Sequence, residues 1–270
     1  MQNVLSDKIT LLDTWFRSRN NDVIVALSGG IDSCLVAFFS RKILGKKKVL
    51  AVISKSPSLK EKDLNIAIDF CERFDIELKI IETKEFENPD YISNPINRCY
   101  FCKVSLYDEL RIISKNFPES IILNGQNFED FSDYRPGIKA GEEFNILHPL
   151  ADCKLTKNEI REIAYNFRLP TWDKPASPCL SSRIPYGQQV TIDKLKKVEA
   201  AENYLNQLGF DEVRVRNYNN SAKIEVEKDR IGELINSQEQ VTSKLLEIGF
   251  ESVVIDNEGF ISGKLNRAIG

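Results

Sequence analysis

Short apolar runs alternate with longer segments of helical periodicity through the first half of the chain. Buried strands are predicted at residues 23–27, 49–53, 76–81 and 121–123, and helices at 3–17, 31–44, 59–74 and 106–113. This alternation is typical of an α/β fold, in which helices cover both faces of a mostly parallel sheet. Ligands of such a sheet bind at the carboxyl ends of the strands, so the loops that follow the predicted strands are the first candidates for a site.

The pattern changes in the second half. A helix over 156–167, opened by a capping threonine, is followed by an irregular segment at 174–187 that contains three prolines. Helices at 193–208 and 238–248, with strands at 212–217, 222–227 and 252–255, then predict a small α+β domain. We therefore expect a first domain over 1–175, a cysteine-containing linker over 176–187 and a C-terminal α+β domain over 188–270.

The loop after the first predicted strand reads Ser-Gly-Gly-Ile-Asp-Ser at 28–33. Gly29 and Gly30 carry no Cβ, so backbone N–H groups can approach a ligand closely, and the start of the next helix favours an anion. Asp32 and Ser33 are suited to hold a magnesium ion and a phosphate oxygen, together with Ser28. A glycine turn with a capping aspartate is the alternative. The loop has neither a Walker-A lysine nor the third glycine of a dinucleotide-binding turn.

Ser-Gly-Gly-x-Asp-Ser resembles the signature of the PP-loop ATP pyrophosphatases. The resemblance implies cleavage of ATP between the α and β phosphates, with AMP and pyrophosphate as products and a carboxyl or carbonyl oxygen as the group that is adenylated. It also implies that adenine lies near Ser54 and Ser56, at the end of the second strand. Gly125, in the loop after the fourth strand, is a further candidate nucleotide contact.

Composition and charge restrict the class of protein. The chain has 270 residues, 42% of them hydrophobic, and a net charge of −3. No apolar stretch is long enough to span a bilayer and the first residues do not resemble a signal peptide, so we expect a cytoplasmic protein without a membrane partner. The negative charge argues against a nucleic-acid partner, and the lysines at 46–48 are expected to form a solvated loop. The single histidine, His148, is expected to be a strand-end residue.

Three arginines are candidates for contacts with phosphate. Arg135, in Asp-Tyr-Arg-Pro-Gly at 133–137, is placed to neutralise pyrophosphate as it leaves, or else is a surface residue of a proline turn. Arg214 and Arg216 alternate with valines on a predicted strand, about 7 Å apart on one face. They can clamp a substrate phosphate, or form a merely solvated face.

Four motifs in this order resemble the LarE family over nearly the whole chain: the loop at 28–33, Asp-Tyr-Arg-Pro-Gly at 133–137, Cys-Leu-Ser-Ser-Arg-Ile-Pro-Tyr-Gly at 179–187 and Val-Arg-Val-Arg at 213–216. LarE proteins are ATP-dependent sulfur transferases that build a nickel pincer cofactor. The resemblance implies adenylation of pyridinium-3,5-biscarboxylic acid mononucleotide, a separate sulfur donor, and a homo-oligomer, hexameric in relatives.

The same resemblance assigns roles to residues. It implies that Cys179 handles sulfur, that Arg183, Arg214 and Arg216 contact phosphate or substrate, and that Glu202, Glu225 and Glu233 form a divalent-metal site. Carboxylates on a helix and a strand are usually plain surface residues, which is the alternative for the three glutamates.

Cys99 and Cys102 depart from the family members that have a single active cysteine. A Cys-x-x-Cys pair alone fits a redox dithiol, half a zinc site or coincidence. With Cys179 it resembles cluster-binding LarE members, which implies a [4Fe-4S] cluster held by three thiolates, with the pair on a short turn before a helix. The other three cysteines, Cys34, Cys71 and Cys153, are expected to be small core residues.

Three alternative functions remain open at this point. The first is a [4Fe-4S]-dependent tRNA thiolation enzyme, although no RNA-binding module or basic face is found in the sequence. LarE-type sacrificial transfer, in which Cys179 gives up its own sulfur, is a second. The third is a non-enzymatic ATP-binding module in which the cysteines hold a structural zinc ion.

Overall fold

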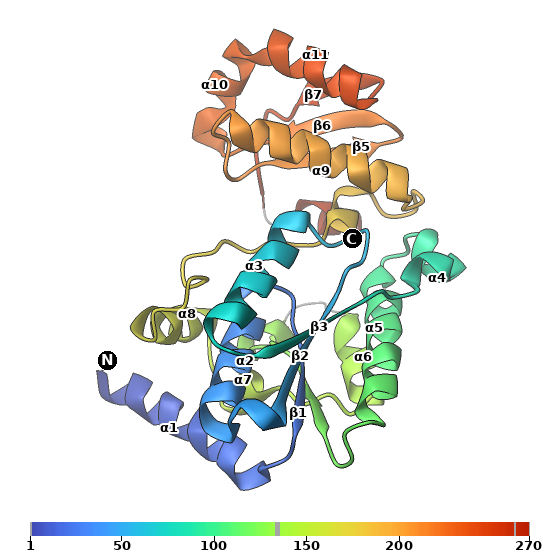
Figure 1. The fold of residues 1–270 in the computed structure, drawn as a ribbon. Coiled ribbons are helices and arrows are strands. Elements are labelled where there is room, and N and C mark those ends of the chain that lie inside the picture. The colour runs from blue at the N-terminus through green and yellow to red at the C-terminus, as the bar shows by residue number, and fades with distance from the viewer. Residues whose placement is uncertain (1, 133–135, 262, 270) are drawn as a thin grey trace. The chain divides into compact units, whose positions relative to one another are not determined.

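The computed structural model describes residues 2–132, 136–261 and 263–269. The chain forms two compact units (Figure 1). The first consists of Met1–Glu85 and Cys99–Ser177, and the second of Phe86–Arg98 and Pro178–Gly270. None of the helices in the described ranges is both long and apolar enough to cross a membrane.

A four-stranded parallel sheet forms the centre of the first unit, in the order β3-β2-β1-β4. Its strands are β1 (Val23–Ala26), β2 (Val49–Ser54), β3 (Glu77–Ile81) and β4 (Ile121–Leu123). The predicted parallel α/β fold is confirmed. Because β1 lies between β2 and β4, the loop that follows it emerges at the middle of the sheet's carboxyl edge, where ligands of parallel sheets bind.

Helices cover both faces of this sheet (Figure 1). They are α1 (Gln2–Arg19), α2 (Ile31–Leu44), α3 (Glu61–Arg73), α5 (Arg98–Ser114), α6 (Gly137–Glu143), α7 (Pro149–Asp152) and α8 (Lys157–Asn166). Val23 and Val25 point into a core with α1, α2, α3 and α8, whereas Ile24 and Ala26 point into a second core with α5 and α6. This alternation follows from the two-residue period of a strand, and it explains why β1 is apolar throughout.

Helix α5 begins at Arg98, well before the predicted start at 106. Cys99 and Cys102 therefore lie within the first two turns of the helix, and the prediction of a short turn before it was wrong. Tyr100 and Val104 pack against the same core as Tyr107, so the apolar stripe extends to the start of the helix at spacings of four and three residues.

The second unit contains a mixed three-stranded sheet in the order β5-β6-β7. Its elements are α4 (Pro89–Ile92), α9 (Ile192–Gln207), β5 (Arg214–Tyr218), β6 (Ser221–Glu225), α10 (Ile231–Asn236), α11 (Gln238–Ile248) and β7 (Ser252–Ile255). Strand β6 is antiparallel to β5 and parallel to β7. Asn219 and Asn220 join β5 to β6 with positive φ angles, as a two-residue hairpin of this handedness requires. The predicted α+β character is confirmed.

Short 3₁₀ helices complete the two units. They are η1 (Lys46–Lys48), η2 (Glu85–Glu87), η3 (Phe128–Ser132), η4 (Leu180–Arg183), η5 (Lys228–Arg230) and η6 (Lys264–Ile269).

Residues 86–98 belong to the second unit, although their sequence position suggested the first domain. Asn94 explains the difference. Its buried side-chain amide donates to the backbone carbonyls of Ile184, Pro185 and Gln188, over 2.7–3.2 Å. The backbone carbonyl of Asn94 accepts from the N–H of Gly187. Buried polar groups need such partners, so these bonds fix the segment to the 178–190 region.

Candidate nucleotide site and the cysteine loop

The loop at 28–33 is folded around the hydroxyl of Ser33. Ser33 Oγ lies 3.0 Å from Ser28 Oγ, accepts from the N–H of Ser28 at 3.2 Å and donates to the carbonyl of Gly30 at 3.1 Å. These bonds close the loop at the start of α2, where the helix dipole favours an anion. The structure thus gives the predicted phosphate loop a defined conformation.

Gly29 adopts a φ of +69°, and a Cβ at this position would lie 2.3 Å from the carbonyl oxygen of Asp63 in α3. Only glycine fits so close an approach. Lys174 Nζ donates to the carbonyl of Gly29 at 2.6 Å and pairs with Asp63 at 2.8 Å, and Ser177 Oγ donates to the same carboxylate. Both charged side chains are largely buried, so the loop is held in place by a desolvated ion pair.

Gly125 packs against the other side of the phosphate loop. A Cβ here would lie 2.4 Å from the backbone nitrogen of Ser33. The glycine therefore lets the loop after β4 contact the first turn of α2 directly. Its predicted role as a nucleotide contact stays a prediction.

The two carboxylate oxygens of Asp32 have different surroundings. Oδ2 forms a short ion pair with Lys157 Nζ, whereas Oδ1 is buried and has no hydrogen-bond partner among the described residues. Lys157 is the first residue of α8, which is capped by Thr156 and Glu159 as predicted. The loop at 28–33 contains no lysine, but in the folded chain Lys157 places a cation beside it. Sequence reasoning missed it because 125 positions separate the two partners.

Ser54 and Ser56 lie at the carboxyl end of β2, as predicted. Ser54 Oγ is 2.6 Å from the hydroxyl of Thr83, and Ser56 Oγ is 2.9 Å from Ser58 Oγ and donates to Glu85 Oε1. Glu85, which follows β3, is only 1% exposed. This buried carboxylate was not among the predicted site residues.

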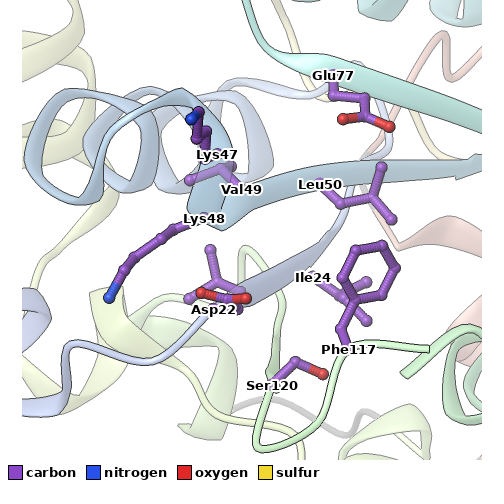
Figure 2. A pocket seen from close by; sticks show the side chains of 10 residues that line it. Asp22, Ile24, Lys47, Lys48, Val49, Leu50, Glu77, Phe117 and Ser120 are labelled. Atoms are coloured by element: carbon purple, nitrogen blue, oxygen red, sulfur yellow. The ribbon is translucent and has the colours of Figure 1, made fainter. Parts of the chain in front are cut away.

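A pocket lies at the opposite edge of the sheet, lined by residues at the amino-terminal ends of β1 and β2 (Figure 2). Lys47 and Lys48 border it, and Lys48 Nζ donates to the backbone carbonyl of Asn20 at 2.8 Å. Phosphate-binding loops of parallel sheets lie at the carboxyl edge, so this hollow is separate from the site at 28–33.

His148 and Arg135 complete the predictions for the first unit. His148 Nδ1 is 2.7 Å from the side-chain oxygen of Asn124, and burial lowers the pKa of its imidazole against the opposing charges of Asp152 and Glu142. It directly follows Leu147, which bridges to Leu123 at the end of β4, so its predicted place at a strand end is confirmed. Arg135 lies outside the described residues.

The six cysteines divide into buried and accessible groups. Cys34, Cys71 and Cys153 are buried, as predicted, and burial raises the pKa of their thiols to about 12, about 12 and about 11. Cys99 is exposed and Cys102 half-buried, both in the first unit, and Cys179 is half-buried in the second. Among the described residues, no group of three or more His, Cys, Asp or Glu side chains is placed to hold a metal ion.

Arg183 fixes the backbone around Cys179. Its Nη1 donates to the carbonyls of Pro178 and Cys179, at 2.8 and 3.2 Å. The hydroxyl of Ser182 donates to the same Cys179 carbonyl at 2.7 Å. Arg98, the residue before Cys99, donates to the carbonyl of Ser181 at 2.9 Å. The cysteine loop is therefore ordered by buried guanidinium groups.

Two buried ion pairs support this loop. Arg183 binds both carboxylate oxygens of Glu202, at 2.8 and 3.1 Å, and Arg216 binds Glu225 at 2.8 Å. Arg216 also donates to the carbonyl of Ser182 at 2.7 Å. All four side chains are buried. Two of the three guanidinium groups that were predicted to meet a substrate phosphate, those of Arg183 and Arg216, are thus engaged with carboxylates.

Arg214 and Glu233, the other predicted site residues of this unit, take no part in these two ion pairs. Arg214 stacks on the ring of Phe260 at 4.9 Å, and burial, followed by the charge of Arg183, lowers the pKa of its guanidinium. Glu233 pairs with Arg230 at the surface. Because Glu202 and Glu225 are bonded to arginines, the three glutamates do not form a preformed metal site in the described part of the chain.

Comparison with known proteins identifies the family. A family described as NAD synthase matches residues 7–89, which contain the phosphate loop. The pyridinium-3,5-bisthiocarboxylic acid mononucleotide synthase of Lactiplantibacillus plantarum, a LarE protein, is 36% identical over 92% of this chain and 90% of its own. Uncharacterized proteins of Synechocystis and Methanocaldococcus jannaschii are 40% and 34% identical, over 98% and 89% of this chain and 99% and 91% of theirs. The chain therefore belongs to the LarE family and has the α/β fold of the PP-loop ATP pyrophosphatases.

Proposed function

We propose that the protein is an ATP-dependent sulfur transferase in the biosynthesis of a nickel pincer cofactor. Its acceptor is pyridinium-3,5-biscarboxylic acid mononucleotide, whose carboxylate oxygen is replaced by sulfur. The observation that carries the proposal is the phosphate loop at 28–33, in which the buried Asp32 Oδ1 has no partner among the described residues. The synthase of L. plantarum, with which the chain aligns over nearly its whole length, supports the choice of acceptor.

Activation of the acceptor is the first step. A carboxylate oxygen attacks the α phosphorus of ATP, an O–P bond forms, and the bond to the bridging oxygen of the β phosphate breaks, so that pyrophosphate leaves with the electron pair. Backbone N–H groups of Gly29 and Ser33 bind the phosphates, whereas those of Ser28 and Gly30 donate to hydroxyls within the loop. Asp32 Oδ1 fits a magnesium ion, which supplies charge neutralisation when bound. Lys157, and Arg135 outside the described residues, neutralise the leaving pyrophosphate.

Sulfur then replaces the activated oxygen. A deprotonated sulfur attacks the acyl carbon, a C–S bond forms, the C–O bond breaks, and AMP leaves. Arg183, Arg214 and Arg216 are proposed contacts for the acceptor's phosphate. A phosphate that binds Arg183 or Arg216 must compete with Glu202 or Glu225, and Arg214 faces an aromatic ring instead.

Cys99, Cys102 and Cys179 are the proposed ligands of a [4Fe-4S] cluster. The pair fits because residues i and i+3 share one face of a helix, and both lie within the first two turns of α5. When bound, such a cluster supplies a position at which hydrosulfide is held deprotonated.

Incubation with the acceptor, Mg-ATP and sulfide, followed by mass spectrometry, tests the function directly. We expect a thiocarboxylate product, and no stimulation of pyrophosphate release by RNA. Unchanged acceptor, or RNA-dependent release with sulfur in the RNA, would refute the proposal in favour of an ATP-binding module or a tRNA thiolation enzyme.

Iron and sulfide analysis of protein prepared without oxygen tests the cluster. Cys99→Ala and Cys102→Ala should lose both the iron chromophore and sulfur transfer, whereas the matched variant Cys153→Ala, at a buried cysteine, should keep both. Loss of one sulfur from Cys179 after a single turnover, with the Cys99 and Cys102 variants still active, would establish sacrificial transfer instead. Zinc in place of iron would support a structural metal.

Assembly into a homo-oligomer, hexameric in relatives, is proposed from the family alone. Light scattering at working concentration checks it, and a mass equal to one chain would contradict it.

A further inference from the structure

Glu85 is a buried carboxylate with one unused oxygen. The side chain is 1% exposed, Oε1 accepts from Ser56, and Oε2 has no hydrogen-bond partner within the described ranges. An unpaired buried acceptor costs roughly 1–3 kcal/mol, and more when it is charged. A group that costs so much and lies at the ligand edge of the sheet is best explained by a donor that arrives with a ligand.

The hydrogen-bond donors of Ser56 and Ser58 already have partners within the protein. Ser56 Oγ accepts a hydrogen bond from the N–H of Ser58 at 3.1 Å and donates a hydrogen bond from its hydroxyl to Glu85. The Ser58 hydroxyl lies 2.9 Å from Ser56 Oγ. This chain ends on Glu85 Oε1 and orients the carboxylate. It leaves Oε2 as a fixed acceptor, because an ionised carboxylate accepts hydrogen bonds and donates none.

The position of Glu85 in the sheet decides which part of a nucleotide it meets. The phosphate loop follows β1, Ser56 follows β2 and Glu85 follows β3, and these strands are consecutive neighbours in the sheet. Adjacent strands are about 4.8 Å apart, so Glu85 lies roughly 10 Å along the edge from the phosphate loop. On the other side of the loop, Gly125 packs directly against Ser33. A nucleotide whose phosphates sit at 28–33 therefore extends toward β3, with its ribose first and its base last.

We propose that Glu85 is the residue that selects adenine, by accepting a hydrogen bond from its 6-amino group through Oε2. The inference rests on the proposed binding of ATP at the phosphate loop. A base with a carbonyl oxygen at position 6 would present an acceptor to an acceptor, so its binding is opposed. The first unit then has separate groups for phosphate and for base.

Nucleotide affinities without acceptor test the proposal in the wild-type protein. Isothermal titration with Mg²⁺ should give a Kd for ATP roughly 10- to 100-fold lower than for ITP or for N6,N6-dimethyl-ATP, because each lacks the amino donor. The 2′-deoxy form of ATP should bind like ATP. Equal Kd values for ATP and ITP would overturn the proposal while the proposed function stands, whereas absence of any ATP binding would overturn the proposed function.

Glu85→Gln provides the second arm. The amide can donate to the 6-oxygen of ITP, so the ratio of the ITP and ATP Kd values should fall by at least about tenfold. Glu82→Gln, at an exposed glutamate of the same unit, is the matched control and should keep the wild-type ratio. A Glu85→Gln protein with unchanged preference for ATP would contradict the proposal, as would one that lost discrimination against 2′-deoxy-ATP instead. If this variant does not fold, the wild-type series decides alone.

Discussion

Two sets of carboxylates, one in each unit, are bonded in different ways. At the carboxyl edge of the first unit's sheet, Asp32 and Glu85 each use one carboxylate oxygen in a bond and leave the other without a partner among the described residues. In the second unit, Arg183 and Arg216 are bonded to Glu202 and Glu225 and to backbone carbonyls. Of these four carboxylates, only those of Asp32 and Glu85 have a buried oxygen without a hydrogen-bond partner in the described part of the chain.

This difference separates two kinds of charged residue. Unused buried acceptors destabilise a protein on their own, which favours a ligand as their missing partner. Buried carboxylates that are bonded to guanidinium groups need no ligand. The same guanidinium groups donate to backbone carbonyls and so fix the loop that carries Cys179. Mutations in the first region should therefore change activity more than stability, and mutations in the second should change stability first.

The largest effect is expected from Arg183→Met. The change leaves Glu202 buried without its cation, so it should lower the free energy of unfolding by about 3–5 kcal/mol, measured by urea denaturation. The double variant Arg183→Met/Glu202→Leu should recover much of this loss. Arg230→Met, which breaks a surface pair with Glu233, is the control and should change the free energy of unfolding much less than Arg183→Met. Full stability of Arg183→Met with weakened acceptor binding would make Arg183 a substrate contact and not a scaffold.

Asp32→Asn should have the next largest effect, on turnover. Loss of the carboxylate removes the proposed magnesium ligand, so pyrophosphate release should fall roughly 100-fold or more, equivalent to about 2.7 kcal/mol. The free energy of unfolding should fall by no more than about 1 kcal/mol, because only the partly exposed ion pair between Oδ2 and Lys157 is weakened and Oδ1 makes no bond to the described residues. Asp69→Asn, at an exposed position of α3, is the control. An active Asp32→Asn enzyme would remove Asp32 from the metal and phosphate site.

Asp256 provides a pH test in the second unit. Burial raises the pKa of its carboxyl, but hydrogen bonds from Lys264 and Lys223 outweigh burial and lower the pKa to about 2. Because the folded pKa is depressed, the stabilisation is complete above the unfolded pKa near 4 and is lost as the pH falls toward 2; it amounts to roughly 2 kcal/mol. The difference in unfolding free energy between wild type and Asp256→Asn should therefore shrink over this range. A difference independent of pH would contradict the assignment.

Lys157→Met should have the smallest effect of the four substitutions, and the effect is on the rate of pyrophosphate release. It removes one cation beside the phosphate loop, so pyrophosphate release should slow by about tenfold, or about 1.4 kcal/mol. Lys154→Met, outside α8, is the control for a change of charge alone. A Lys157→Met enzyme with wild-type turnover would make the lysine only a partner that orients Asp32.

Much of the first unit was predictable because β1 and β2 are uninterrupted apolar runs and the phosphate loop is a continuous motif. The start of α5 was missed because cysteine, tyrosine and lysine hid a stripe that Tyr100 and Val104 continue. The partners of the site residues were beyond reach for a different reason. Lys157 and Asp32 meet only in the folded chain, and no local pattern pairs them.

The second unit shows the same limit. The alternation of valine and arginine in β5 predicted two guanidinium groups on one face, but not that Arg216 would pair with Glu225 on the neighbouring strand. Burial of Glu202 likewise depends on Arg183, which lies in a separate segment. Resemblance to the family supplied candidate roles for these residues, and only contacts could show which charges were already paired.

Phosphorus-31 NMR of a reaction containing Mg-ATP, sulfide and pyridinium-3,5-biscarboxylic acid mononucleotide tests most directly whether the phosphate loop activates a carboxylate. We predict resonances of AMP and pyrophosphate that grow together, only when the acceptor is present, and that are absent with Asp32→Asn. Formation of ADP and inorganic phosphate would contradict cleavage between the α and β phosphates and with it the proposed function.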